Sequence, residues 1–286
     1  MESINKEIEN TGNQTAFDYN QLADSSLVMG IVNITPDSFY DGGHYFSLEH
    51  SIKHCEQLIA EGVDIIDLGA ASTRPGAMDV GPDEELKRLL PILDYLIKNH
   101  PEIPASVDTF HSAVAKEVIK KGASIINDIS GGNFDSNMFE TVAKLNVPYV
   151  LMHIQGTPKD MQSEPHYDNV VTEVYEYISE KVSRLRALGM EKIIIDPGFG
   201  FGKTVEHNYA LLKNLEKFKS LGLPILVGIS RKSMINKVLK TKPENALTGT
   251  IVLNTIALLN SANILRVHDV KEAKQVIQLV QKVKSS

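Results

Sequence analysis

The stretch that decides the fold is VMGIVNITPDSFYDGG, residues 28–43. Its first five residues are apolar with no polar residue between them, which is typical of a strand buried on both faces. Polar and turn-forming residues follow from Asn33 onward. A helical pattern then runs over 48–60, with Ser47 as the expected N-cap. The unit is therefore strand, polar loop and helix, with polar side chains directly after the strand.

The same unit recurs along the rest of the chain. Strands are expected at 28–32, 63–68, 105–109, 124–128, 148–153, 192–196, 224–228 and 264–268. Helices are expected at 48–60, 83–99, 112–121, 137–145, 170–188, 205–221, 233–239 with 244–260, and from Asp269, as the cap, to about 283. About eight such units predict an α/β fold, a (β/α)8 TIM barrel in a single domain. The alternative is an open doubly wound sheet, but that sheet binds ligands mainly at one switch point, whereas here polar residues close almost every strand.

Composition narrows the class of protein. The 286 residues are 42% hydrophobic and 23% charged, which is ordinary for a globular protein, and no linker divides them. We expect a flexible lead-in at 1–24 and one barrel domain at 25–286. The net charge of −7 argues against a nucleic-acid partner, and the lack of any run of about 18 apolar residues against a membrane span. The single cysteine, Cys55, rules out a disulfide within the chain and fits a reducing, cytoplasmic location.

In a barrel, the residues at the carboxyl ends of the strands converge on one face. Here that face collects Asn33, Thr73, Arg74, Asp108, Asn127, Asp128, Met152, His153, Asp196, Phe201, Lys203, Ser230, Lys232, Arg266 and His268. One subset, Asp108, Asn127, Asp196 and Lys232, offers the acceptors and donors that suit a flat, nitrogen-rich heterocycle. The alternative for each aspartate is that it caps the next helix or a turn.

A second subset suits an anion. Arg74, Arg266 and His268 are candidates, with Lys203 as a further possibility. Arg266 and His268 are two residues apart, so they face the same side of a continuing strand, where two cationic groups suit a phosphate. For Lys203 a solvated rim position is a reasonable alternative.

Asn33 is the candidate metal ligand. Mg²⁺ prefers oxygen ligands and takes one or two from the protein, the rest coming from phosphate and water. From spacing alone, an Asx turn before Pro36 is the better explanation of Asn33. The glycines at 198–202 miss the spacing of nucleotide-binding loops, because Pro197 and Lys203 occupy positions that those motifs need as glycine.

Seven motifs in order resemble the bacterial dihydropteroate synthase family. They are MGIVNITPDSFYDGG at 29–43, DIIDLGAASTRPGA at 64–77, SVDTFHSAVAKEVIKKGASIINDIS at 106–130, VLMHIQGTP at 150–158, IIIDPGFGFGK at 193–203, VGISRKSMI at 227–235 and ILRVHDV at 264–270. The resemblance covers nearly the whole chain. It implies a barrel, usually a homodimer, that joins 4-aminobenzoate to 6-hydroxymethyl-7,8-dihydropterin diphosphate in folate biosynthesis, releasing diphosphate with Mg²⁺.

The resemblance also implies roles for the residues at the strand ends. Asn33 would hold Mg²⁺; Asp108, Asn127, Asp196 and Lys232 would bind the pterin, with Met152 packing on its ring; Arg74, Arg266 and His268 would bind diphosphate, helped by Thr73; and Thr73, Pro75, Phe201, Ser230 and Lys232 would border the aminobenzoate. Arg74, Lys232 and Arg266 would be the catalytic residues. The helices after the seventh and eighth strands would form the dimer face.

The sequence departs from the family at one place. Ala70 and Ala71 stand where many members have Gly-Glu, so a loop carboxylate is missing. Two other readings are a methyltetrahydrofolate-binding module of methyl transfer, which needs no diphosphate site, and a non-catalytic pterin-binding paralogue, which should have lost Arg74 or Asn33. The residues present favour the synthase over both.

Overall fold

The computed structural model describes residues 17–23, 25–34, 43–70 and 80–286. Within these ranges, eight parallel strands form one sheet in the order β6-β5-β4-β3-β2-β1-β8-β7. The strands are β1 (Leu27–Asn33), β2 (Ile65–Gly69), β3 (Ala105–Asp108), β4 (Ile125–Asp128), β5 (Tyr149–Met152), β6 (Ile193–Asp196), β7 (Leu226–Val227) and β8 (Ile264–Val267). A parallel bridge from Ile195 to Ile225 closes the sheet between β6 and β7, so the expected barrel is confirmed.

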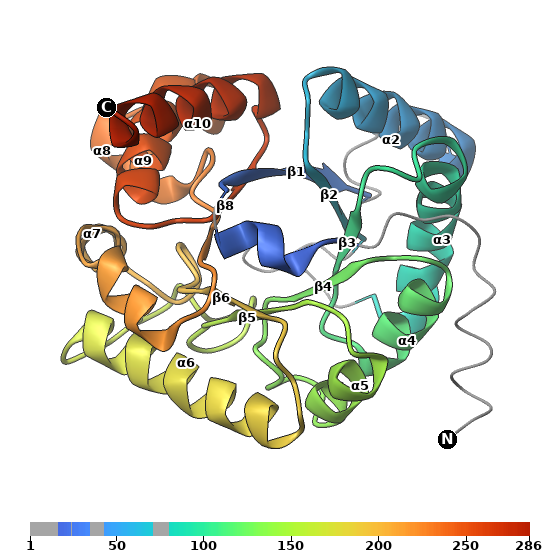
Figure 1. Ribbon diagram of the computed structural model, residues 1–286, viewed down its shortest axis with the longest axis horizontal. Helices are drawn as coiled ribbons and strands as arrows, with labels where there is room; N and C mark the ends of the chain where they lie inside the picture. The colour runs from blue at the N-terminus through green and yellow to red at the C-terminus, as the bar shows by residue number, and fades with distance from the viewer. Residues whose placement is uncertain (1–16, 24, 35–42, 71–79) are drawn as a thin grey trace.

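Helices surround the strands on the outside (Figure 1). In the described part of the chain they are α2 (Gly43–Ala60), α3 (Pro82–Asn99), α4 (Ser112–Lys120), α5 (Met138–Leu145), α6 (Val170–Ala187), α7 (Val205–Lys213), α8 (Ser233–Leu239), α9 (Leu247–Leu259) and α10 (Val270–Lys284). Short 3-10 helices are η1 (Tyr19–Ala23), η3 (Leu215–Leu221) and η4 (Pro243–Asn245). None of the helices in these ranges has both the length and the apolar character that a bilayer span requires.

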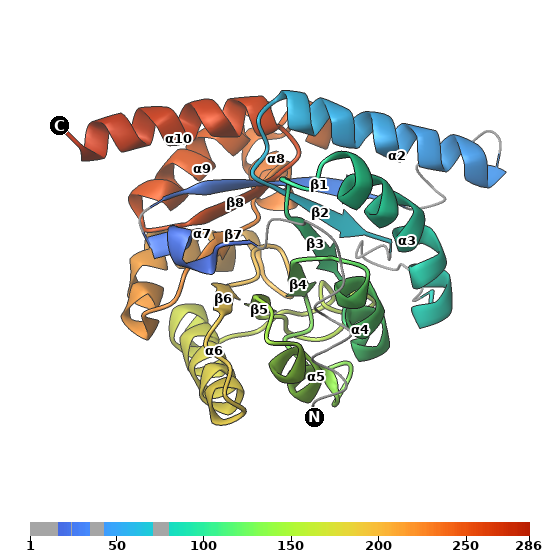
Figure 2. The ribbon, with the colours of Figure 1, turned by 45° about the vertical axis from the view of Figure 1, so that its right-hand side comes forward.

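The inside of the barrel is apolar at the end where the strands begin. Leu22 of η1 is fully buried there and packs with Met29, Ile65 and Ile194 in one cluster, which also contains Phe17. The helix η1, the short blue helix at the centre of Figure 1, lies across this end of the barrel, and Figure 2 shows it from the side. Residues 17–23, part of the segment expected to be a flexible lead-in, are thus packed against the barrel floor.

Several expected element boundaries were wrong. The helix expected at 205–221 is divided into α7 and η3, and at the junction the side chain of Asn214 donates to the carbonyl of Ala210 and competes with the helical pattern. The helix α2 begins at Gly43, so Ser47 lies inside it and is not its N-cap. Asp269 occupies the N-cap position of α10 but makes no side-chain cap, because its carboxylate pairs with Arg231.

Candidate active site

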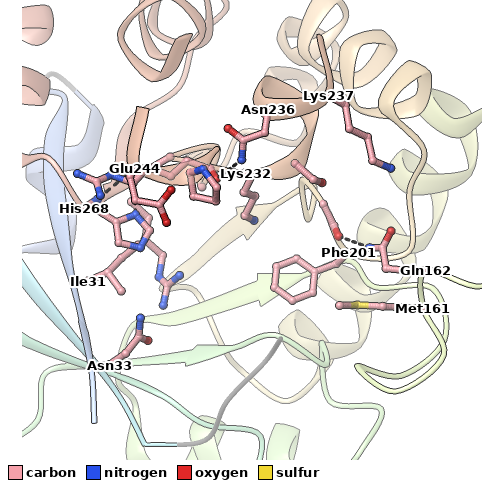
Figure 3. A pocket seen from close by; sticks show the side chains of 17 residues that line it. Ile31, Asn33, Met161, Gln162, Phe201, Lys232, Asn236, Lys237, Glu244 and His268 are labelled. Atoms are coloured by element: carbon pink, nitrogen blue, oxygen red, sulfur yellow. Dashed lines mark hydrogen bonds between the residues drawn. The ribbon is translucent and has the colours of Figure 1, made fainter. Parts of the chain in front are cut away.

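A cavity of about 940 Å³ opens at the carboxyl ends of the strands. The described residues that line it include six of the predicted site residues, Asn33, Phe201, Ser230, Lys232, Arg266 and His268. In Figure 3, Lys232 extends into the cavity from one side, Phe201 forms part of a wall, and Asn33 lies at the opposite side. The convergence of strand ends predicted from the sequence is therefore confirmed for these six residues.

Arg266 stands at the centre of a buried charge network. Its Nε donates to Asp67 Oδ2 at 2.7 Å, and its Nη2 donates to Asp108 Oδ2 at 2.9 Å. Two carboxylates hold the planar guanidinium in a fixed orientation, and both raise its pKa against the lowering effect of burial. Arg266 therefore presents a permanent positive charge to the cavity that it lines.

Asp67 is the functional residue that sequence reasoning missed. Its side chain is fully buried, accepts from Ser106 Oγ at 2.6 Å, and accepts from Asn127 Nδ2 at 3.1 Å in addition to Arg266. The sequence contains the signal, since Asp67 interrupts an apolar strand as Arg266 does in β8. Asp67 lies within its strand rather than after it, so the pattern of polar residues at strand ends does not include it.

Asp196 and Lys232 form the second charged region. Burial raises the pKa of Asp196, while the nearby Lys232 lowers it. Burial lowers the pKa of Lys232 to about 8, with Asp196 acting in the opposite direction. Lys232 Nζ donates to the carbonyl of Phe199 and lies 4.6 Å from the ring centroid of Phe201, a cation–π distance. The pair can offer an acceptor and a donor to a polar heterocycle.

The absence of a side chain at Gly228 keeps the space beside these cations open. A Cβ atom placed there would lie 3.9 Å from Lys232 Nζ and 3.8 Å from Arg266 Cβ. Any longer side chain would therefore extend toward the space that both cations face. Gly228 itself lines the cavity, which explains why a glycine suits the end of β7.

His268 contributes a hydrogen bond rather than the expected charge. Its backbone N–H donates to Ser230 Oγ at 3.2 Å, and Ser230 Oγ lies 3.1 Å from His268 Nδ1. Burial, then the charges of Arg266 and Arg231, lower the pKa of His268 to about 4. The imidazole is therefore neutral at pH 7, and the hydroxyl donating to Nδ1 leaves the proton on Nε2. The expectation of His268 as a second cationic group is therefore replaced by that of a neutral hydrogen-bonding group, and its role toward an anion stays a prediction.

Arg231 joins the loops that follow β7 and β8. It adopts φ of 57°, a left-handed conformation unusual for arginine, and its guanidinium makes two hydrogen bonds to Asp269. Its backbone N–H donates to Thr250 Oγ1 at 3.1 Å. These contacts fix the chain between Ser230 and Lys232, both of which face the cavity.

Four predicted residues lie below the cavity lining rather than in it. Asn127, Met152 and Asp196 are buried, and Asp108 is bound to Arg266. Met152 belongs to an apolar cluster with Ile129, Ile154 and Met161, against which Phe201 packs. This apolar surface beside charged groups suits a flat ring with polar edges.

Asn33 is the residue available for a metal ion. It ends β1 with an exposed side chain that lines the cavity, and a Cβ on Gly69 would lie 3.7 Å from its Oδ1 and 3.8 Å from Asp108 Oδ2, so the two oxygens flank Gly69. Among the described residues no group of three or more His, Cys, Asp or Glu side chains could hold a metal. A single amide oxygen fits Mg²⁺, which takes most of its ligands from phosphate and water.

Other predicted residues lie elsewhere. Thr73, Arg74 and Pro75 fall outside the described residues, as does Ala71. Asp128 is buried and bound by the backbone of Ser130 and Gly132 and by Tyr149, so it stabilises a turn. Lys203 is buried and faces His153, not the cavity, so both its anion-site and its solvated-rim assignments were wrong.

The chain matches known proteins over most of its length. A family model described as pterin binding enzyme matches residues 29–268. The chain is 45% identical over 256 residues to the dihydropteroate synthase of Escherichia coli strain K12, covering 89% of this chain and 90% of that protein.

Solved structures agree. The Xanthomonas albilineans dihydropteroate synthase with 4-aminobenzoic acid superposes with a TM-score of 0.86 at 39% identity, covering 92% of this chain and 94% of that one. The same enzyme in complex with 7,8-dihydropteroate gives a TM-score of 0.82 at 36% identity, covering 92% and 95%. The resemblance seen in the motifs is thereby confirmed, and the chain belongs to the dihydropteroate synthase family of pterin-binding enzymes.

Proposed function

We propose that this protein is a dihydropteroate synthase. It condenses 6-hydroxymethyl-7,8-dihydropterin diphosphate with 4-aminobenzoate, forming 7,8-dihydropteroate and diphosphate. The observation that carries the proposal is one cavity with a fixed cation, Arg266, beside the Asp196–Lys232 pair and an aromatic wall at Phe201. The similarity to synthases solved with 4-aminobenzoic acid and with 7,8-dihydropteroate supports it.

The pterin fits the deeper, polar part of this site. Asp196 and Asp108 accept from ring N–H and amino groups, Asn127 and Lys232 donate to ring acceptors, and the apolar cluster around Met152 contacts the ring face. Burial keeps these groups out of water, so each matched hydrogen bond is stronger and each mismatched one more costly. These buried groups therefore favour a ligand whose ring edge carries the hydrogen-bond donors and acceptors of a pterin.

Arg266 and His268 act on the leaving group. As the C–O bond at the exocyclic methylene breaks, the electron pair leaves with diphosphate, and Arg266 stabilises the growing negative charge. His268 offers its Nε2–H to the same group. Asn33 would hold Mg²⁺, which supplies further positive charge to the diphosphate. Arg74 and Thr73 stay predicted contributors to this step.

The aminobenzoate is placed near Phe201, Ser230 and Pro75, with Lys232 at the junction of the two substrates. Its neutral amine attacks the methylene carbon, the C–N bond forms, and the nitrogen then loses a proton. The pterin ring stabilises the developing cation, so the protein acts through positioning and through charge at the leaving group.

The test is to measure how much of each product the protein forms. Incubating the protein with pterin diphosphate, Mg²⁺ and 4-aminobenzoate should yield equal amounts of 7,8-dihydropteroate and diphosphate. Tight pterin binding without product would contradict the proposal and indicate a non-catalytic paralogue. The cytoplasmic location stays a prediction.

We also propose a homodimer through α9 and α10. Val252, Ile256 and Leu259 lie on one face of α9 and are 51%, 37% and 52% exposed, and Leu279 and Val283 of the neighbouring α10 are both 70% exposed. Such a patch on helices that lie together suits a second copy related by a twofold axis (Figure 1). Light scattering should give twice the mass of one chain, and Ile256→Glu should shift it to one chain.

A further inference from the structure

Lys203 is a buried amine that the proposed reaction does not use. Burial lowers the pKa of Lys203 to about 7, with the charge of Asp196 acting in the opposite direction. Lys203 follows the Gly198–Gly202 turn after β6, and its relative exposure is 3%. It is not among the described residues that line the cavity. A buried lysine needs partners for its charge, so what it contacts indicates what it does.

Three polar atoms lie within hydrogen-bond distance of its side-chain nitrogen. Nζ lies 2.9 Å from the carbonyl oxygen of Gly198 and 3.0 Å from that of Phe201, so the side chain folds back on the turn that precedes it. The third contact is to His153 Nδ1 at 2.9 Å, at the end of β5. Lys203 therefore closes the turn on itself and fastens it to the neighbouring strand.

His153 is built to be an acceptor in this contact. Its ring is buried and packs against Tyr177 and Tyr167, with centroid distances of 4.7 Å and 6.0 Å. Burial, followed by the charge of Lys203, lowers the pKa of His153 well below its usual value, so the imidazole is neutral. In the tautomer with its proton on Nε2, the neutral ring accepts from Lys203 Nζ through Nδ1.

Two glycines let the turn lie directly on the segment after β5. A Cβ on Gly198 would sit 1.8 Å from the carbonyl oxygen of His153, and one on Gly202 would sit 2.3 Å from that of Gln155. Both glycines have positive φ, 73° and 61°. The turn therefore has no room to shift toward β5, and Lys203 opposes movement away from it.

The opposite side of this turn carries Phe201 into the cavity wall. Gln162 Nε2 donates to the carbonyl of Gly200 at 2.6 Å (Figure 3). Lys232 Nζ donates to the carbonyl of Phe199. The ring of Phe201 lies under Lys232 Nζ. The position of the turn thus sets where the aromatic wall stands relative to Lys232.

We propose that Lys203 and His153 are positioning residues that fix Phe201 in the cavity wall and thereby set the affinity for the aromatic amine substrate. This inference rests on the proposed function. Neither residue touches substrate; both act through the turn between them. Two of the deeper pterin contacts, Asp108 and Asn127, lie on β3 and β4, away from this turn. Asp196 and Lys232 touch its backbone at Gly198 and Phe199, so the pterin site should respond to the turn less than the aromatic wall does.

Steady-state kinetics of Lys203→Met test the proposal. The KM for 4-aminobenzoate should rise about tenfold or more, because a displaced wall costs orientation, whereas the KM for pterin diphosphate should change less than about threefold. Lys213→Met, which removes an exposed lysine from α7, is the matched control and should leave both constants unchanged. Equal increases in both KM values, or no change in either, would overturn the proposal.

A pair of His153 variants separates positioning from simple loss of folding. His153→Asn retains an oxygen acceptor near the place of Nδ1 and should restore most of the aminobenzoate affinity, whereas His153→Leu removes the acceptor and should behave like Lys203→Met. Thermal unfolding of each variant is measured alongside. If Asn and Leu variants have the same KM, the hydrogen bond does not position the wall.

A fluorescence readout keeps the inference independent of turnover. The chain contains no tryptophan, so Phe201→Trp introduces a single fluorophore in the turn. Adding Lys203→Met should increase quenching of that fluorophore by acrylamide, while adding Lys213→Met should not. Unchanged quenching would contradict the positioning role, whereas lack of product in the unmodified protein would contradict only the proposed function.

Discussion

The two ends of the barrel interior differ in chemistry although the same strands build both. The floor is apolar and is formed by Met29, Ile65, Ile125, Val150, Ile194, Leu226 and Ile264, with Leu22 closing it. Two residues further along four of these strands stand Asp67, Asn127, Asp196 and Arg266. Since residues two apart face the same side of a strand, each of these strands changes from apolar to polar within one repeat.

This difference separates stability from chemistry along each strand. The floor removes large side chains from water and carries little that reacts. The mouth confines charges that are costly to bury and are tolerated because they pair with one another. Variants of the floor should lower the free energy of unfolding and leave activity nearly unchanged. Variants of the mouth should lower activity, and they should also lower stability where a buried charge loses its partner. The following predictions test this in order of expected effect.

Arg266→Met should have the largest effect, because Arg266 belongs to both the network and the reaction. It leaves Asp67 and Asp108 without their shared cation, which costs about 3–5 kcal/mol of unfolding free energy. The rate constant kcat should fall about 10²-fold or more as leaving-group charge goes unstabilised. Urea unfolding and diphosphate release measure the two effects. Arg266→Lys keeps a charge without the planar geometry and should recover part of each; full activity in Arg266→Met would contradict its assigned role.

Leu22→Ala tests the floor alone. Leu22 is fully buried, so its truncation should cost about 2–5 kcal/mol of unfolding free energy through lost burial and a cavity. Activity at a temperature where the variant stays folded should match the unmodified protein. Ser25→Ala, near the same end but outside the apolar cluster, is the control. A large drop in kcat would show that the floor and mouth are not separable.

Asp67→Asn tests a residue that supports the mouth without lining the cavity. The amide oxygen can replace Oδ2 as the acceptor from Asn127 and Arg266, but the negative charge that pairs with Arg266 is lost and the NH2 faces Ser106 Oγ, which costs about 1–3 kcal/mol of stability. Arg266 loses one of its two charged partners, so activity should fall about tenfold or more. Steady-state assays and thermal unfolding give both values. Unchanged kinetics would mean that Asp108 alone orients Arg266.

The pH dependence of pterin use should report Lys232. Its pKa of about 8 means that the ammonium form predominates below that pH and is lost above it. The value of kcat/KM for pterin diphosphate should therefore fall with rising pH above about 8, approaching tenfold per pH unit. Lys232→Arg keeps its charge throughout and should have a flatter profile at a lower maximum. A constant value up to pH 10 would contradict a charged role for Lys232.

The barrel was predictable because it depends on repetition. Apolar strands, helical periodicity and polar strand ends recur along the chain, and the polar ends identified Asn33, Arg266 and Lys232 directly. Boundaries were less predictable, since the end of α7 depends on a local competition at Asn214 that periodicity does not register.

The missed features have a common cause, which is that partners distant in sequence decide them. Asp67 becomes functional through Arg266, which is 199 residues away. Lys203 has the sequence context of an exposed loop but is buried by His153, 50 residues earlier. From the sequence, His268 was expected to be cationic. Burial and the charge of Arg266 lower its pKa and favour the neutral ring.

The most direct test of the separation compares two residues on β6, Ile194 of the floor and Asp196 of the mouth. Ile194→Ala should lower the unfolding free energy by about 2–5 kcal/mol and leave kcat/KM nearly unchanged. Asp196→Asn should lower kcat/KM at least about tenfold, because one donor replaces an acceptor of the pterin site.

The stability of Asp196→Asn should fall less than that of Ile194→Ala at neutral pH, because Lys232 loses a partner while a costly buried carboxylate is removed. Burial raises the pKa of Asp196, so its stabilising contribution is present below its unfolded pKa and is lost as pH rises through the folded value. The measurement is unfolding free energy and kcat/KM for both variants at pH 7. The predicted result is that Ile194→Ala mainly lowers the unfolding free energy, whereas Asp196→Asn mainly lowers kcat/KM. Similar losses of both quantities in both variants would contradict the division between floor and mouth.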